Sequence, residues 1–223
     1  MPKWIEIGAL VLAVIAGFVN AIGLLSFEHQ SVSHVSGTAT LFGTSLFSAS
    51  ATSLLHLLGV LVSFLLGSAI AGLLLHGDAL RLGKHYDTAL LLESFLLFVA
   101  LVLLNGGYFY GHFFASSACG LQNALATKYS GAVIRTTHLT GIFTDLGIMI
   151  GSSLRGEKLD TRNVKLFLII IAGFIAGGAF GAFAFAEYQL YSLLFPVIAC
   201  LLLSLIYRIY SRNQTFRESH SET

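Results

Sequence analysis

Long apolar runs separated by short polar segments fill most of the 223-residue chain. Six of the runs approach the ~20 residues that a helix needs to cross ~30 Å of hydrocarbon. They cover residues 5–25, 53–75, 88–104, 108–127, 164–186 and 190–210. Hydrophobic residues make up 56% of the chain and charged residues only 10%, whereas soluble chains carry roughly 25% charged residues. The pattern predicts an all-α integral membrane protein with six transmembrane helices.

Two further apolar stretches, residues 37–48 and 141–152, are too short to span a membrane. About 12 residues of helix extend roughly 18 Å, which is about half of a bilayer. Each stretch follows a segment that suits a helix poorly, residues 28–34 in one case and residues 129–138 in the other. Irregular backbone survives at membrane depth only where protein covers it or where it lines a watery cavity. We therefore expect two re-entrant loops, each ending in a half-helix.

The segments around these loops carry one motif twice. The first copy is Gly-Phe-Val-Asn-Ala at 17–21 with Ser-His-Val-Ser-Gly-Thr at 33–38. The second copy is Gly-Leu-Gln-Asn-Ala at 120–124 with Thr-His-Leu-Thr-Gly-Ile at 137–142. The separation between the Asn and the His is nearly the same in the two copies. Matched identities at nearly matched spacing indicate an internal duplication.

The basic residues indicate how the loops enter the membrane. They are Lys3, Arg81, Lys84, Lys128, Arg135, Arg155, Lys158, Arg162, Lys165, Arg208, Arg212 and Arg217. The loops around residues 28, 105 and 187 contain no Lys or Arg. If both half-helices are re-entrant, every basic residue falls on one side, as the positive-inside rule requires. The charge pattern favours this topology and predicts that both termini are cytoplasmic in a bacterial inner membrane.

Each repeat then has three spans and one loop, so the second repeat starts on the opposite side of the membrane. We expect a first inverted repeat at 1–104 with its loop near 28–48. The second repeat covers 105–211 with its loop near 129–152, and a polar tail covers 212–223. Inverted repeats with interrupted helices at the midplane are typical of secondary transporters.

The two motifs resemble those of the YoaK family of bacterial membrane proteins, a family of unassigned function. The matching residues are Gly17, Ala21, Ser36, Gly37 and Gly43, then Gly120, Gln122, Asn123, Ala124, Thr137, Thr140, Gly141, Asp145, Leu146 and Gly147. Asn20 stands where the family usually has Asp, and Thr38 stands where it usually has Asn. The resemblance covers nearly the whole chain. It implies a multi-span inner-membrane protein and no established substrate.

The two half-helix starts are the predicted substrate-binding site. A helix N-terminus leaves free N–H groups and about half a positive charge, so two opposed starts would attract an anion or a polar solute. The residues of this predicted site are Asn20, Ser36, Gly37, Thr38, Asn123, Thr137, Thr140 and Gly141. The alternative is that the hydroxyls only cap the half-helices and that the two Asn side chains only bond neighbouring helices.

Four titratable residues are candidates for coupling or gating: His34, Glu93, His138 and Asp145. Asp145 lies in the second half-helix, where its counterpart by spacing in the first is Leu41. It can bind a coupling cation or proton, or it can complete the helix cap. Glu93 lies within a predicted span, where a carboxylate is costly and usually has a function. The alternative is a shallow position near the membrane interface. The two His residues can titrate near neutrality or serve structural hydrogen bonds.

The sequence lacks the features that a metal site or a nucleic-acid-binding surface would need. The two His residues have no third or fourth metal ligand at motif spacing, so we expect no metal site and no cofactor. A net charge of +1 without a basic cluster argues against nucleic acid. The glycines at 173, 177 and 181 have small-xxx-small spacing, which indicates tight helix contact within the protomer or a homo-oligomer.

The sequence thus predicts a transporter or channel for a small polar or anionic solute. An intramembrane enzyme is the first alternative, because His34, His138, Asp145 and Glu93 could supply acid–base groups. However, no nucleophile motif, zinc signature or nucleotide loop is present. A membrane sensor or scaffold is the second alternative.

Overall fold

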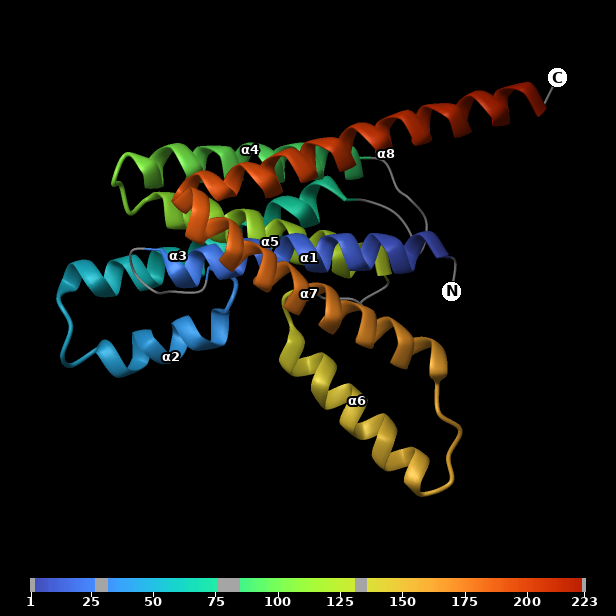
Figure 1. The fold of residues 1–223 in the computed structure, drawn as a ribbon, viewed down its shortest axis with the longest axis horizontal. Coiled ribbons are helices and arrows are strands. Elements are labelled where there is room, and N and C mark those ends of the chain that lie inside the picture. The colour runs from blue at the N-terminus through green and yellow to red at the C-terminus, as the bar shows by residue number, and fades with distance from the viewer. Residues whose placement is uncertain (1–2, 27–31, 76–84, 131–135, 222–223) are drawn as a thin grey trace.

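The computed structural model describes residues 3–26, 32–75, 85–130 and 136–221, and these form helices and short connections without a strand. The all-α class is confirmed. The helices are α1 (Lys3–Leu25), α2 (Val35–Ser45), α3 (Ala51–Leu74), α4 (Tyr86–Asn105), α5 (Gly111–Ser130), α6 (Leu139–Leu154), α7 (Thr161–Tyr188), the 3₁₀ helix η1 (Gln189–Leu193) and α8 (Leu194–Ser221). Both ends of the chain lie at the same end of the molecule (Figure 1).

Four segments are long and apolar enough to cross a membrane: Ile5–Leu25, Ala51–Leu74, Tyr86–Asn105 and Thr161–Ser211. The last of these contains α7 and the part of α8 up to Ser211, and η1 separates the two helices. Helix α5 occupies most of the fourth predicted span but is not among the four, because polar residues such as Ser116, Gln122 and Asn123 lower its hydropathy. The chain is a membrane protein with several apolar helices, and the six-span arrangement stays a prediction.

The long helices form a bundle in which α1 packs against α7, α3 packs against α5, and α4 packs against α5 and α8. Glycines allow the helices of the α1–α7 pair and of the α3–α5 pair to approach each other closely. A Cβ on Gly17 would overlap the carbonyl oxygen of Phe174, and a Cβ on Gly177 would overlap that of Val14. The glycines at 173 and 181 also face α1. The glycine stripe of α7 is therefore packed against a helix of the same chain.

The α3–α5 pair repeats these contacts. A Cβ on Gly120 would overlap the carbonyl oxygen of Phe64, and a Cβ on Gly67 would overlap that of Ser117. Gly120 opens the second copy of the motif as Gly17 opens the first. The spacing from Phe64 to Gly67 in α3 equals the spacing from Phe174 to Gly177 in α7. The contact of α1 with α7 and the contact of α5 with α3 are thus made by equivalent residues with the two halves exchanged.

The α4–α8 interface is also reciprocal. Ser94 Oγ donates a hydrogen bond to the carbonyl oxygen of Val197 at 2.8 Å, and Ser204 Oγ donates one to that of Asp87 at 2.7 Å. The sequence separation between Ser94 and Ser204 equals the separation between Asp87 and Val197. The hydrogen-bond donors Ser94 and Ser204 therefore occupy equivalent positions of α4 and α8.

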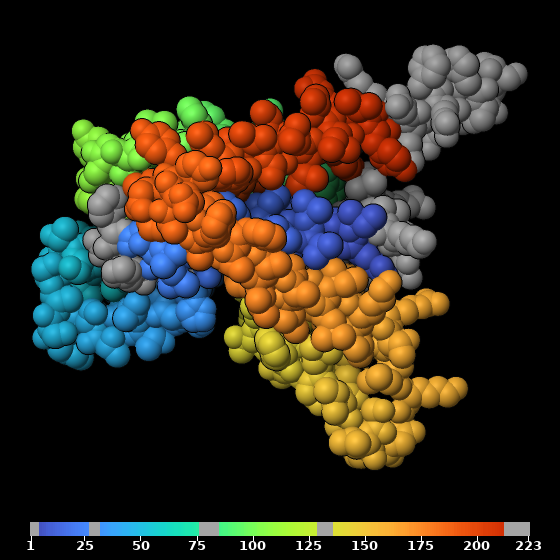
Figure 2. Space-filling model, in the orientation of Figure 1, coloured from blue at the N-terminus to red at the C-terminus, as the bar shows by residue number. Residues whose placement is uncertain are grey.

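The short helices α2 and α6 lie outside this bundle. Both begin near the middle of the molecule and run outward toward opposite ends, and α2 packs on α3 while α6 packs on α7 (Figure 1). In Figure 2 they form two separate projections on one side of the molecule. Helix α2 has 11 residues and α6 has 16. Both are shorter than the ~20 residues of a perpendicular span.

Candidate functional site

The two short helices begin in the same way. His34 is the N-cap residue of α2 with φ −90° and ψ 69°, and His138 is the N-cap of α6 with φ −95° and ψ 56°. Neither imidazole caps its helix. Instead each ring lies over the first turn, where a Cβ on Gly37 would overlap the His34 ring and a Cβ on Gly141 would overlap the His138 ring. A larger residue at either Gly would therefore have to displace the exposed imidazole.

The two Asn residues hold the backbone that leads into each short helix. Asn20 Oδ1 accepts a hydrogen bond from Ser33 Oγ at 2.7 Å. Asn123 Oδ1 accepts one from the backbone N–H of Thr137 at 3.5 Å. Ser33 and Thr137 are equivalent positions, each directly before the His. Both amides therefore tie a long helix to the segment ahead of a short helix.

The hydroxyls of the predicted site bond largely within their own helices. Thr38 Oγ1 donates to the carbonyl oxygen of His34 at 3.2 Å. Thr40 Oγ1 donates to Ser36 and Thr144 Oγ1 donates to Thr140, both at 2.9 Å. This back-bonding is common for hydroxyls inside helices. Of the remaining predicted residues, Ser36, Thr140 and Asp145 are exposed, and Thr137 is half-buried.

Two residues that the sequence did not single out as site residues are buried near the second motif. Gln122 is buried on α5 and Thr136 is buried two residues ahead of the α6 N-cap. Among the described residues, Gln122 Nε2 and Thr136 Oγ1 have no hydrogen-bond partner. Their counterparts in the first copy are Val19 and Val32, and both of these valines are buried. A position-by-position comparison of the two copies would have found this difference.

Glu93 lies apart from the half-helix starts. It is 2% exposed within the bundle, while its depth in the membrane stays a prediction. Its carboxyl lies close to the Cys200 thiol, and Oε2 has no hydrogen-bond partner among the described residues. In the part of the chain that the structure describes, α4 contacts neither α2 nor α6. The predicted residues thus fall into two groups, one at the half-helices and one inside the bundle.

A pocket of about 380 Å³ lies between α2 and α3. Its polar lining comes from Ser45, Thr52, Ser53 and His56, and its apolar lining from Leu41, Ala49, Leu57 and Phe109. The His56 ring packs on that of His112 with their centroids 5.3 Å apart. The sequence did not single out these His residues because they lie outside the repeated motif.

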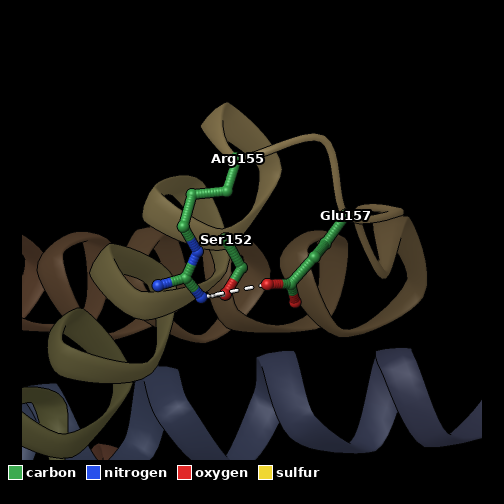
Figure 3. A network of polar contacts seen from close by, with 3 residues as sticks. All are labelled: Ser152, Arg155 and Glu157. Carbon is green, nitrogen blue, oxygen red and sulfur yellow. Dashed lines mark hydrogen bonds and ion pairs between the residues drawn. The ribbon is translucent and has the colours of Figure 1, made fainter.

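The turn that joins α6 to α7 carries an exposed polar network (Figure 3). Arg155 Nη2 donates to Ser152 Oγ at 3.2 Å and to Glu157 Oε1 at 3.0 Å. Gly156 provides the positive φ of 92° that reverses the chain. Because both charged side chains are more than half exposed, the ion pair contributes at most ~1 kcal/mol. This network shapes the end of α6 and offers no binding cavity.

The His, Cys, Asp and Glu residues described by the structure form no group of three that could hold a metal ion. The prediction that the protein has no metal or cofactor stays a prediction. A long acidic or basic cluster is likewise missing from the chain, whose net charge is +1.

Comparison with known proteins agrees with the membrane assignment. The family model described as "Protein of unknown function (DUF1275)" matches residues 8–206. The chain is 28% identical over 200 residues to the "UPF0700 transmembrane protein YoaK" of Bacillus subtilis (strain 168), and the match covers 84% of this chain and 87% of that protein. No solved structure matches the chain.

Proposed function

This chain belongs to the DUF1275 family of proteins of unknown function, and on that premise we propose that it is a transporter or channel for a small polar or anionic solute. The solute site lies at the starts of α2 and α6, which are two re-entrant half-helices of a 3+3 inverted repeat. Both termini are cytoplasmic in the inner membrane. The observation that carries the proposal is the exchanged pairing of equivalent residues between the two halves.

That exchange supports a two-fold relation between the halves for a geometrical reason, and the odd number of spans expected in each repeat would make this relation an inverted one. If a two-fold axis relates the halves, a contact between two elements must recur between their counterparts. Gly17 against Phe174 recurs as Gly120 against Phe64. The α4–α8 hydrogen bonds recur across their own interface. Such a fold places interrupted helices at its centre, where transporters of this architecture bind solute.

The polar content of the second motif supports a solute site there. Buried donors without a partner are rare in folded proteins, and each calls for a specific explanation. Gln122 Nε2 and Thr136 Oγ1 are two such groups, and a bound polar solute would satisfy them. The N–H groups at the first turn of α6 offer further donors. A donor-rich lining favours a solute with acceptor oxygens, such as a small anion.

The starts of α2 and α6 do not contact each other within the described residues. The proposal therefore uses each start as one wall of a solvated route and does not require a closed cage. An enzyme or a sensor remains the alternative class.

A matched pair of glycine substitutions tests the proposal. Gly141→Val displaces the His138 ring from the α6 start, whereas Gly147→Val places its side chain where a Cβ meets nothing within 4 Å. We expect Gly141→Val to lower flux of nitrate, phosphate or erythritol into proteoliposomes by about tenfold, a change of ~1.4 kcal/mol. Gly147→Val should match the unmodified protein. No protein-dependent flux of any of these solutes, or equal flux in the two variants, would contradict the proposal.

A further inference from the structure

The bundle buries one carboxyl group far from the half-helices. Glu93 lies on α4, which packs against α5 and α8, and its side chain is 2% exposed. It is among the largest fully buried side chains of the described residues. A carboxylate is costly at membrane depth and is retained there mainly where it has a function.

The groups that face Glu93 are thiols. Cys200 on α8 and Cys119 on α5 both lie close to the carboxyl. Both cysteines are free and buried. Oε2 is left without a hydrogen-bond partner among the described residues. The environment therefore satisfies only part of the carboxyl.

No cation faces Glu93 from the described helices packed against α4. The other ionisable groups of these elements lie elsewhere. His112 and Lys128 are about two turns or more from Cys119 along α5, and Tyr207 and Arg208 are about two turns from Cys200 along α8. Tyr86 and Asp87 lie about two turns away on α4 itself, and His56 of α3 packs on His112. The two ion pairs of the described residues lie outside this region.

We propose that Glu93 is a membrane-buried proton-binding site that couples proton movement to transport. The inference rests on the proposed function for its coupling and on the bundle geometry for its proton binding. Without a facing cation, the buried group is stable as the neutral acid, which can be stored in an apolar core where a carboxylate cannot. The site exists in one half only, because the position directly before Ser204, which corresponds to the position directly before Ser94, is Leu203.

Release of the proton requires water to reach the carboxyl through the α4–α8 interface. The hydrogen bonds of Ser94 and Ser204 join the two helices on either side of the Glu93–Cys200 contact. When this interface opens, water reaches the carboxyl, the O–H bond of Glu93 breaks and the proton passes to that water. Uptake from the other side reverses the step.

Infrared spectroscopy tests proton binding without requiring transport. The protonated carboxyl of Glu93 gives a C=O stretching band that disappears as the pH of proteoliposomes is raised. We expect Glu93→Gln, which preserves the size and the neutral charge of the acid, to lose that band. Asp145→Asn changes an exposed carboxylate on α6 and should keep it. A wild-type spectrum without a band that Glu93→Gln removes, or a band that does not titrate while the helices stay folded, would overturn the assignment.

Nitrate flux tests the coupling separately, because nitrate does not cross lipid as a neutral acid. An imposed proton gradient should accelerate nitrate uptake in the unmodified protein and leave the flux of Glu93→Gln unchanged. Equal acceleration in both proteins would overturn the coupling. If neither protein carries nitrate or another tested solute, the transport proposal fails, and a titrating Glu93 band would still establish the proton site.

Discussion

The short helices of the first and second motif copies begin alike, with His34 over Gly37 and His138 over Gly141. They differ in the side chains buried behind those starts. Val19 and Val32 close the first copy with apolar packing, whereas Gln122 and Thr136 occupy the equivalent positions of the second. The shared His–Gly arrangement is what an internal duplication predicts for the two copies. The copies therefore differ in the polarity of their buried side chains, and the buried Glu93, whose counterpart is Leu203, is a second difference between the halves.

Substitution of glycine at the α1–α7 and α3–α5 interfaces should give the largest loss of stability, and the loss should be similar in the two equivalent pairs. Gly17→Val and Gly120→Val each force a side chain into a backbone carbonyl of the facing helix. Each should lower the free energy of unfolding by about 3 kcal/mol, measured by denaturation in mixed micelles. Gly72→Val, which meets nothing within 4 Å, is the control. A large loss in only one of the two pairs would break the equivalence of the halves.

The His–Gly contact predicts a double-mutant cycle. Gly141→Ala places a methyl group in the space of the His138 ring, and because that exposed ring can turn away, the change should cost about 1 kcal/mol of unfolding free energy. In a His138→Ala background the same change should cost less than about 0.5 kcal/mol, because the space is vacant. His34 and Gly37 should give the same coupling. Additive costs in either copy would show that the ring does not occupy that space in solution.

Exchanging the buried residues sharpens the difference between the copies. Thr136→Val replaces a buried hydroxyl without a partner, so it should raise the free energy of unfolding by about 1 kcal/mol. It should also lower solute flux, because the hydroxyl would line the site. Val32→Thr in the first copy buries a new hydroxyl and should destabilise the protein by about 2 kcal/mol. Stabilisation by Thr136→Val with unchanged flux would leave that hydroxyl a purely structural residue.

The smallest predicted effect concerns the α4–α8 interface. Ser94→Ala and Ser204→Ala each remove one hydrogen bond to a backbone carbonyl. Each should lower the free energy of unfolding by about 1 kcal/mol, and the two losses should be equal within ~0.5 kcal/mol. Ser48→Ala, on the exposed α2–α3 connection, serves as the control. Unequal losses would restrict the reciprocity to the glycine contacts.

The amino-acid pattern anticipates the helices, their short companions and the duplication, because these depend on local hydropathy and spacing. Small-xxx-small spacing at Gly173 and Gly177 also indicates a close helix contact. It does not identify α1 as the partner, since pairing depends on how the whole bundle packs. Glu93 illustrates the same boundary. Apolar residues surround it in sequence, so its depth in the bundle becomes visible only when α5 and α8 are placed around α4.

The sequence also could not predict that Gln122 Nε2 and Thr136 Oγ1 lack a hydrogen-bond partner. A polar residue in an apolar helix usually finds a partner, and the sequence does not reveal which ones fail to do so. Helix α5 carries enough polar residues to fall outside the apolar spans. That lower hydropathy is the sequence signal that accompanies the polar second copy.

Inversion of the two repeats is the central claim, and cysteine accessibility tests it most directly. Ser48→Cys lies on the exposed connection after α2, and Lys158→Cys lies on the exposed connection after α6, while native Cys119 and Cys200 are buried. A membrane-impermeant maleimide added to intact cells should label Ser48→Cys and not Lys158→Cys. Inside-out vesicles should give the opposite result. Labelling of both positions from the same side would contradict the inverted repeat.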